Sequence, residues 1–100
     1  MNVSSFERIR VSLTRAEDAC IAHLVELTSQ SQPVWDDINK GYCLVNELRE
    51  IHDRALDEFA LRTWRYPLGA MSTLLKRSAV VLTQSLLTLD QIALRYYSRS

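Results

Sequence analysis

The sequence has 100 residues, of which 47% are hydrophobic and 24% charged, a balance typical of one small globular domain and not of a disordered chain. It contains only two glycines and two prolines, too few for the closely spaced turns of an all-β domain. Twelve basic and twelve acidic residues give a net charge of zero, which argues against a general nucleic-acid-binding protein. We therefore expect a single all-α domain that spans residues 1–100.

The first predicted element is a helix over residues 4–29. Its apolar residues recur at steps of three and four, the pattern of one face of an α-helix. They are Phe6, Ile9, Leu13, Ala16, Cys20, Leu24 and Leu27. The polar run at 28–32 then predicts a loop.

The second predicted helix covers residues 33–65. Pro33 stands where a first helical residue belongs, and Asp36 and Asp37 follow in the first turn, where the helix dipole favours acids. Gly41 lies inside the helical pattern and costs about 1 kcal/mol relative to alanine in a helix. This cost leaves open a break that would separate a short fourth helix at 33–40 from the main one.

The third predicted helix covers residues 68–97, after a turn in which Pro67 and Gly69 take the positions typical of a type I turn. Each of the three helices would be about 40 Å long at 1.5 Å per residue. Because the connections are short, successive helices should be antiparallel. The sequence thus predicts an up-down-up three-helix bundle.

Two apolar series run along the third helix, each repeating every seven residues. Leu75, Leu82, Leu89 and Tyr96 form the series expected to face the core. The second series, about 160° around the helix, consists of Val80, Leu87 and Leu94 and is flanked by Arg77, Gln84 and Gln91. Either this helix is buried centrally within the chain, or the second series meets another protein surface. Self-association as a homodimer is then the simplest route, because identical ridges can pair about a two-fold axis.

The residues that could carry chemistry do not form a recognisable catalytic or metal-binding pattern. His52 lacks a second ligand three or four positions away, and His23 flanks the apolar face of its helix, as core histidines do. Cys20 and Cys43 form no C-x-x-C pair, and we expect two separate buried thiols. We predict no metal, no cofactor and no enzymatic activity.

The leading functional hypothesis is a protein–protein interaction module, either an adaptor, a small chaperone or an inhibitor of a larger assembly, of the bacterial or phage accessory type. The apolar stretches are too short and too polar to span a membrane, and the N-terminus lacks a signal-peptide pattern, so we expect a cytoplasmic protein. Aromatic and arginine residues, which are enriched in binding hot spots, supply secondary interaction candidates. They are Trp64, Arg65, Tyr66, Arg95 and Tyr97. The alternative is nucleic-acid binding through the basic last helix, which carries four basic residues and one acid over residues 67–100.

Overall fold

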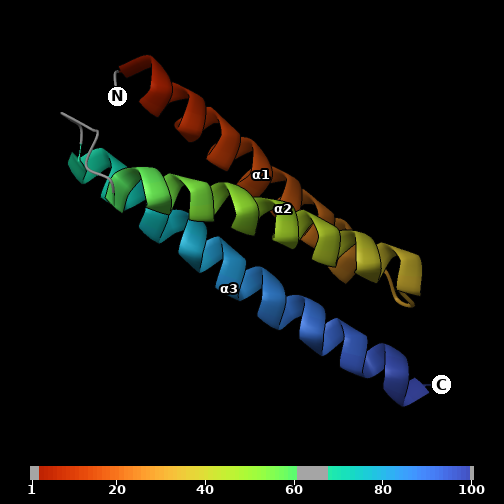
Figure 1. Cartoon of the computed structure of the whole chain (residues 1–100). Coiled ribbons are helices and arrows are strands. Elements are labelled where there is room, and N and C mark those ends of the chain that lie inside the picture. The colour runs from red at the N-terminus through yellow and green to blue at the C-terminus, as the bar shows by residue number, and fades with distance from the viewer. Residues whose placement is uncertain (1–2, 61–67, 100) are drawn as a thin grey trace.

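The protein is a bundle of three α-helices (Figure 1). The computed structural model describes the backbone of residues 3–60 and 68–99, and the side chains of residues 6–60 and 69–98. The helices are α1 (Val3–Ser29), α2 (Trp35–Ala60) and α3 (Leu68–Arg99), and they pack against one another in an assembly 53 Å long and 18 by 17 Å across. The described residues contain no strand, which confirms the predicted all-α bundle.

At each end that the described residues test, the helix boundaries lie within two residues of the predicted ones, and the start of α2 is the difference with a clear structural reason. The backbone carbonyl of Val34 accepts hydrogen bonds from the N–H groups of Asp37 and Ile38, at 3.1 and 3.2 Å. The helix therefore begins at Trp35, and the prediction that Pro33 is its first residue was wrong, because Pro33 lies before the helix. The predicted continuation of this helix over 61–65 lies outside the described residues.

α2 runs from Trp35 to Ala60 without a break at Gly41. Gly41 is buried on α2 against side chains of both neighbouring helices. A Cβ atom at this position would lie 2.6 Å from Cδ2 of Leu89 and 3.3 Å from Cδ2 of His23. Glycine is therefore needed here for close packing of α2 against α1 and α3.

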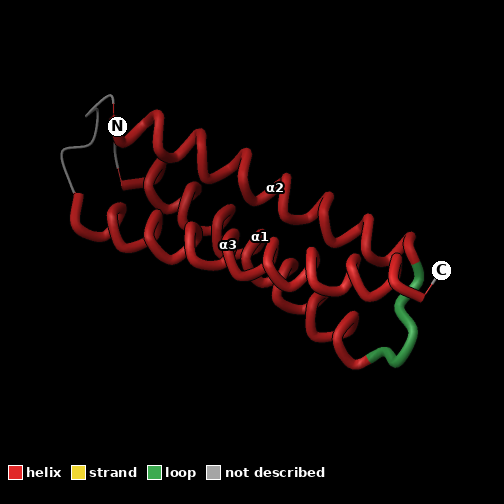
Figure 2. The backbone as a smooth tube through the Cα atoms, turned by 90° about the horizontal axis from the view of Figure 1, so that it is seen from below, coloured by secondary structure: helices red, strands yellow, loops and turns green. Residues whose placement is uncertain are grey.

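The predicted apolar faces form the core. Leu13, Leu27 and Leu48 are fully buried, and the first series of α3 is buried at Leu75, Leu82 and Leu89, with Tyr96 packed against the core. Figure 2 shows that the loop at 30–34 lies at the same end of the bundle as the C-terminus. This end of the bundle, and the side along which α1 and α3 meet, carry the features described next.

Candidate interaction face

The second apolar series of α3 lies on the outside of the bundle. Val80, Leu87 and Leu94 are 59%, 54% and 67% exposed, respectively. We call these three side chains the outer ridge. Because they remain exposed, central burial of α3 within the chain, one of the two alternatives from the sequence, does not occur.

α1 adds two exposed apolar side chains beside the outer ridge. Ile21 and Val25, which are 48% and 63% exposed, line a groove between α1 and α3. The groove has a volume of about 370 Å³, and Val80 and Gln84 of α3 line its other wall. We call the five exposed side chains (Ile21, Val25, Val80, Leu87 and Leu94) the α1–α3 face.

The groove is more apolar than its composition suggests. Thr28 and Thr88 line it, but each hydroxyl donates a hydrogen bond to the carbonyl one turn back in its own helix, at 2.8 and 2.9 Å. Because these donors are already satisfied, the threonines contribute mainly methyl groups to the lining. Gln84 supplies the side-chain amide of the groove, so the surface favours an apolar occupant.

Arg77, a predicted interface residue, is held by α1. Its Nε donates to both carboxylate oxygens of Glu17, at 3.1 and 3.2 Å, and one of its terminal amino groups lies 3.3 Å from Oγ1 of Thr14. The Glu17 residue is only 4% exposed, whereas the Arg77 side chain is about half exposed. This pair joins α1 to α3 and, with the residues that line the groove, indicates that an α1 residue lies about level with the α3 residue 60 positions later.

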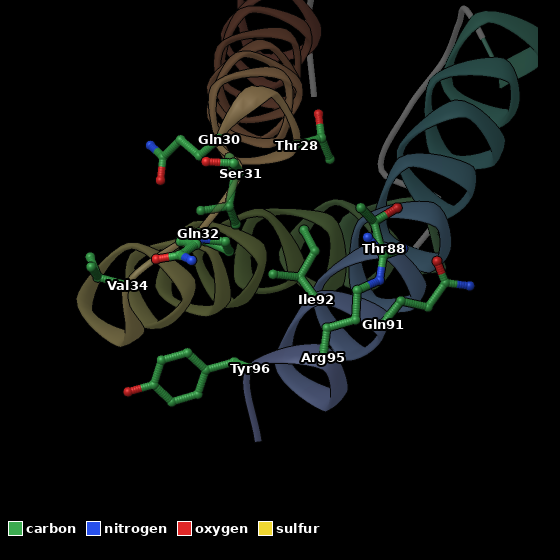
Figure 3. A pocket seen from close by; sticks show the side chains of 12 residues that line it. Thr28, Gln30, Ser31, Gln32, Val34, Thr88, Gln91, Ile92, Arg95 and Tyr96 are labelled. Atoms are coloured by element: carbon green, nitrogen blue, oxygen red, sulfur yellow. The ribbon is translucent and has the colours of Figure 1, made fainter. Parts of the chain in front are cut away.

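A second cavity, which we call the end pocket, lies at the loop end of the bundle (Figure 3). It has a volume of about 620 Å³ and shares Thr28 and Thr88 with the groove. Gln91 and Arg95, both predicted interaction candidates, line it, together with Ile92 at its base. The groove and the end pocket are therefore neighbouring parts of one hollowed strip along α3.

Aromatic residues close this end of the bundle on the other side of the end pocket. The rings of Trp35, Tyr96 and Tyr97 have centroids 5.5 to 5.8 Å apart. Tyr97, a predicted secondary candidate, therefore packs on Trp35 but stays largely exposed. The other aromatic candidates, Trp64 and Tyr66, and their neighbour Arg65 lie outside the described residues.

Both histidines are part of the core. His23 is buried, and its Nε2 lies 2.7 Å from the backbone carbonyl of Asp37, to which it donates because a carbonyl can only accept. Nδ1 of His52 lies 2.5 Å from the hydroxyl of Ser78, which donates in turn to the carbonyl of Leu75. Ser78 is fully buried, so this His–Ser pair joins α2 to α3 and is closed to a substrate.

The two cysteines form no disulfide, and only one of their thiols is buried. Cys20 is in the core, and burial raises the pKa of its thiol, with Glu47 and Glu17 acting in the same direction. The prediction that Cys43 is also buried was wrong, because the position faces solvent on α2. Cys43 lies beside the buried apolar residues of α2, on the part of the helix that neither α1 nor α3 covers.

Tyr42 links α2 to α3 on the side of the bundle away from the groove. Its hydroxyl donates a 2.6 Å hydrogen bond to Oδ1 of Asp90. Burial and this hydrogen bond to a carboxylate raise the pKa of Tyr42 to about 12. The side between α2 and α3 is thus tied by polar contacts, whereas the α1–α3 face beyond Arg77 is apolar.

Among the described side chains of α3, the basic ones do not form one patch. Lys76 and Arg95 are 19 positions apart, which corresponds to about 28 Å along the helix. Arg77 lies between them and is bound to a buried carboxylate. The side chain of Arg99 lies outside the described residues.

The sequence analysis missed Ile21 and Val25. They lie beside the apolar face of α1 that runs from Phe6 to Leu27, and two apolar residues there are common on the exposed surface of a helix. Within the described residues, no group of three His, Cys, Asp or Glu side chains is placed to hold a metal ion. The described helices include none with the length and apolar character needed to cross a membrane. Comparison of the chain with protein-family models, with curated proteins and with solved structures finds no match.

Proposed function

We propose that this chain is a non-enzymatic protein–protein interaction module, acting as an adaptor, a small chaperone or an inhibitor of a larger assembly. The observation that carries the proposal is the α1–α3 face, in which five aliphatic side chains from two neighbouring helices are exposed and three of them, Ile21, Val25 and Val80, line an apolar groove. Single exposed apolar residues are common on proteins, but contiguous ones beside a groove are typical of interaction sites.

The outer ridge contributes little to the folding of the single chain. α3 already buries its first apolar series, and the core is complete without Val80, Leu87 or Leu94. Full burial of a valine or leucine side chain contributes roughly 1.5–3 kcal/mol. A partner that covers the ridge would gain much of this free energy at each of three positions, which is enough to support specific binding.

Site-specific photo-crosslinking in living cells tests the proposal. A photoreactive amino acid replaces Val80 on the α1–α3 face, and a matched control chain carries it at Leu56, an exposed apolar position on α2. We expect discrete cross-linked protein bands from position 80 and none of these bands from position 56. Equal labelling from both positions, or no product from position 80, would contradict an interaction module that uses this face.

A further inference from the structure

We propose that the occupant of the α1–α3 face is a second copy of this chain, bound antiparallel about a two-fold axis that passes beside Leu87. This inference rests on the proposed function, because it names the partner that the same face receives. Three features of the described residues carry it: the area of the face, the spacing of the outer ridge and the positions of two unpaired charges.

The exposed apolar area is more than half of what a specific interface of standard size buries on each partner. Each of the five side chains of the α1–α3 face is about half exposed or more, which gives roughly 100 Å² each and about 500 Å² per copy. A specific interface buries about 800 Å² per partner, and much of the remainder is polar rim. Gln84, Gln91 and Arg95 border the face and supply that rim.

The spacing of the outer ridge suits pairing with itself. Its residues lie seven apart, so an axis at Leu87 places Val80 of one copy opposite Leu94 of the other and the two Leu87 side chains opposite each other. Such an arrangement is self-complementary and closes after two copies, as a two-fold interface must.

Two unpaired charges select the antiparallel direction. Neither Asp18 nor Arg95 has an ion-pair partner among the described residues. Asp18 is exposed one turn before Ile21, and the offset of 60 positions between α1 and α3 places it level with Ser78. In the antiparallel pair, Ser78 lies opposite Tyr96 of the second copy, so Asp18 comes level with the Arg95 of that copy to within one residue, about 1.5 Å. A parallel pair would instead set Arg95 beside Arg95, which is unfavourable.

The mass in solution tests whether the dimer forms. Light scattering after size exclusion, over a series from micromolar to submillimolar protein, should give twice the chain mass of 11.5 kDa at the upper end. Leu87→Glu should give a monomer over the whole series, because two carboxylates would face each other at the axis. The control Leu56→Glu, with the same change at an exposed leucine of α2, should remain dimeric. A wild-type monomer at every concentration would overturn the dimer, and discrete cross-links to other proteins from position 80 would then leave the proposed function standing.

A charge exchange tests the antiparallel direction. Asp18→Arg and Arg95→Asp should each raise the dimer dissociation constant about tenfold, because each creates two like-charge contacts per dimer. The double variant D18R/R95D should restore the wild-type constant to within a few-fold. Circular dichroism checks that all variants keep the wild-type helix content. A double variant that binds no more tightly than the single variants would overturn the antiparallel arrangement.

Discussion

Replacement of Gly41 by alanine should destabilise this protein, although alanine is the better helix former. Gly41 lies in the interior of α2, where a change to alanine gains about 1 kcal/mol of helix propensity. The added Cβ, however, would lie 2.6 Å from Cδ2 and 3.4 Å from Cδ1 of Leu89, a side chain that is fully buried. Leu89 cannot turn away into solvent, so the helices or its rotamer must shift.

The size of the effect follows from two opposing contributions. Overpacking of a filled core costs about 1–3 kcal/mol. After the propensity gain is subtracted, Gly41→Ala should lower the free energy of unfolding by between zero and about 2 kcal/mol. For a domain of this length, 1 kcal/mol corresponds to about 4–8 °C in Tm.

Gly69 provides a matched control in the same chain. It lies in the first turn of α3, and a Cβ there would meet nothing within 4 Å. Gly69→Ala should therefore raise the free energy of unfolding by a few tenths of a kcal/mol, up to about 1. Urea denaturation of the two variants and the wild type, at one protein concentration, measures both effects.

The two glycine variants should change stability in opposite directions, and that contrast can refute the reasoning. If Gly41→Ala stabilises the protein as much as Gly69→Ala does, the close approach of α2 to α3 is not as described. A second-site test uses Leu89→Ala, which removes the atoms that the new Cβ meets. The double variant should be about 1 kcal/mol more stable than the sum of the two single changes predicts.

Three further predictions concern an ion pair, a phenol and a thiol. Arg77→Ala should lower the free energy of unfolding, measured by urea denaturation, by about 1–3 kcal/mol, because it leaves the buried carboxylate of Glu17 unpaired. Arg95→Ala, made in the monomeric Leu87→Glu background as a control, should lower it by less than about 0.5 kcal/mol. The raised pKa means that Tyr42 binds its proton more tightly in the folded chain than in the unfolded one, so its contribution to stability is complete below about pH 10 and is lost as the pH rises toward 12. In an absorbance titration, Tyr42 should be the last phenol to ionise, and Tyr42→Phe should remove that last step. An aromatic disulfide reagent should react fast with one thiol per folded chain, that of Cys43, because the thiol of Cys20 is buried and has a raised pKa. Cys43→Ser should abolish the fast reaction, and fast reaction of both thiols in the wild type would contradict the packing of α1.

The sequence by itself determined the fold class, the three helices and most of the core. These depend on local spacing, and the steps of three and four that place Leu13 and Leu27 on one face persist in whatever bundle the helix joins. The seven-residue repeat likewise divided the apolar residues of α3 into two series, but only the structure showed that the second series is exposed. The start of α2 was misplaced by two residues because Pro33 is equally acceptable just before a helix, where its missing N–H also costs nothing.

Only the tertiary structure decided what Gly41 and Ile21 do. Helix propensity counts a glycine as a weakness, but here the missing side chain lets α2 approach α3, a fact that depends on Leu89, 48 residues away in the sequence. Ile21 and Val25 form a groove with Val80 only because α1 and α3 pack at the offset that the Glu17–Arg77 contact marks. Periodicity fixes which way a residue points from its own helix, whereas its neighbours on other helices depend on how the helices slide and rotate against each other, which the packing of the whole core decides.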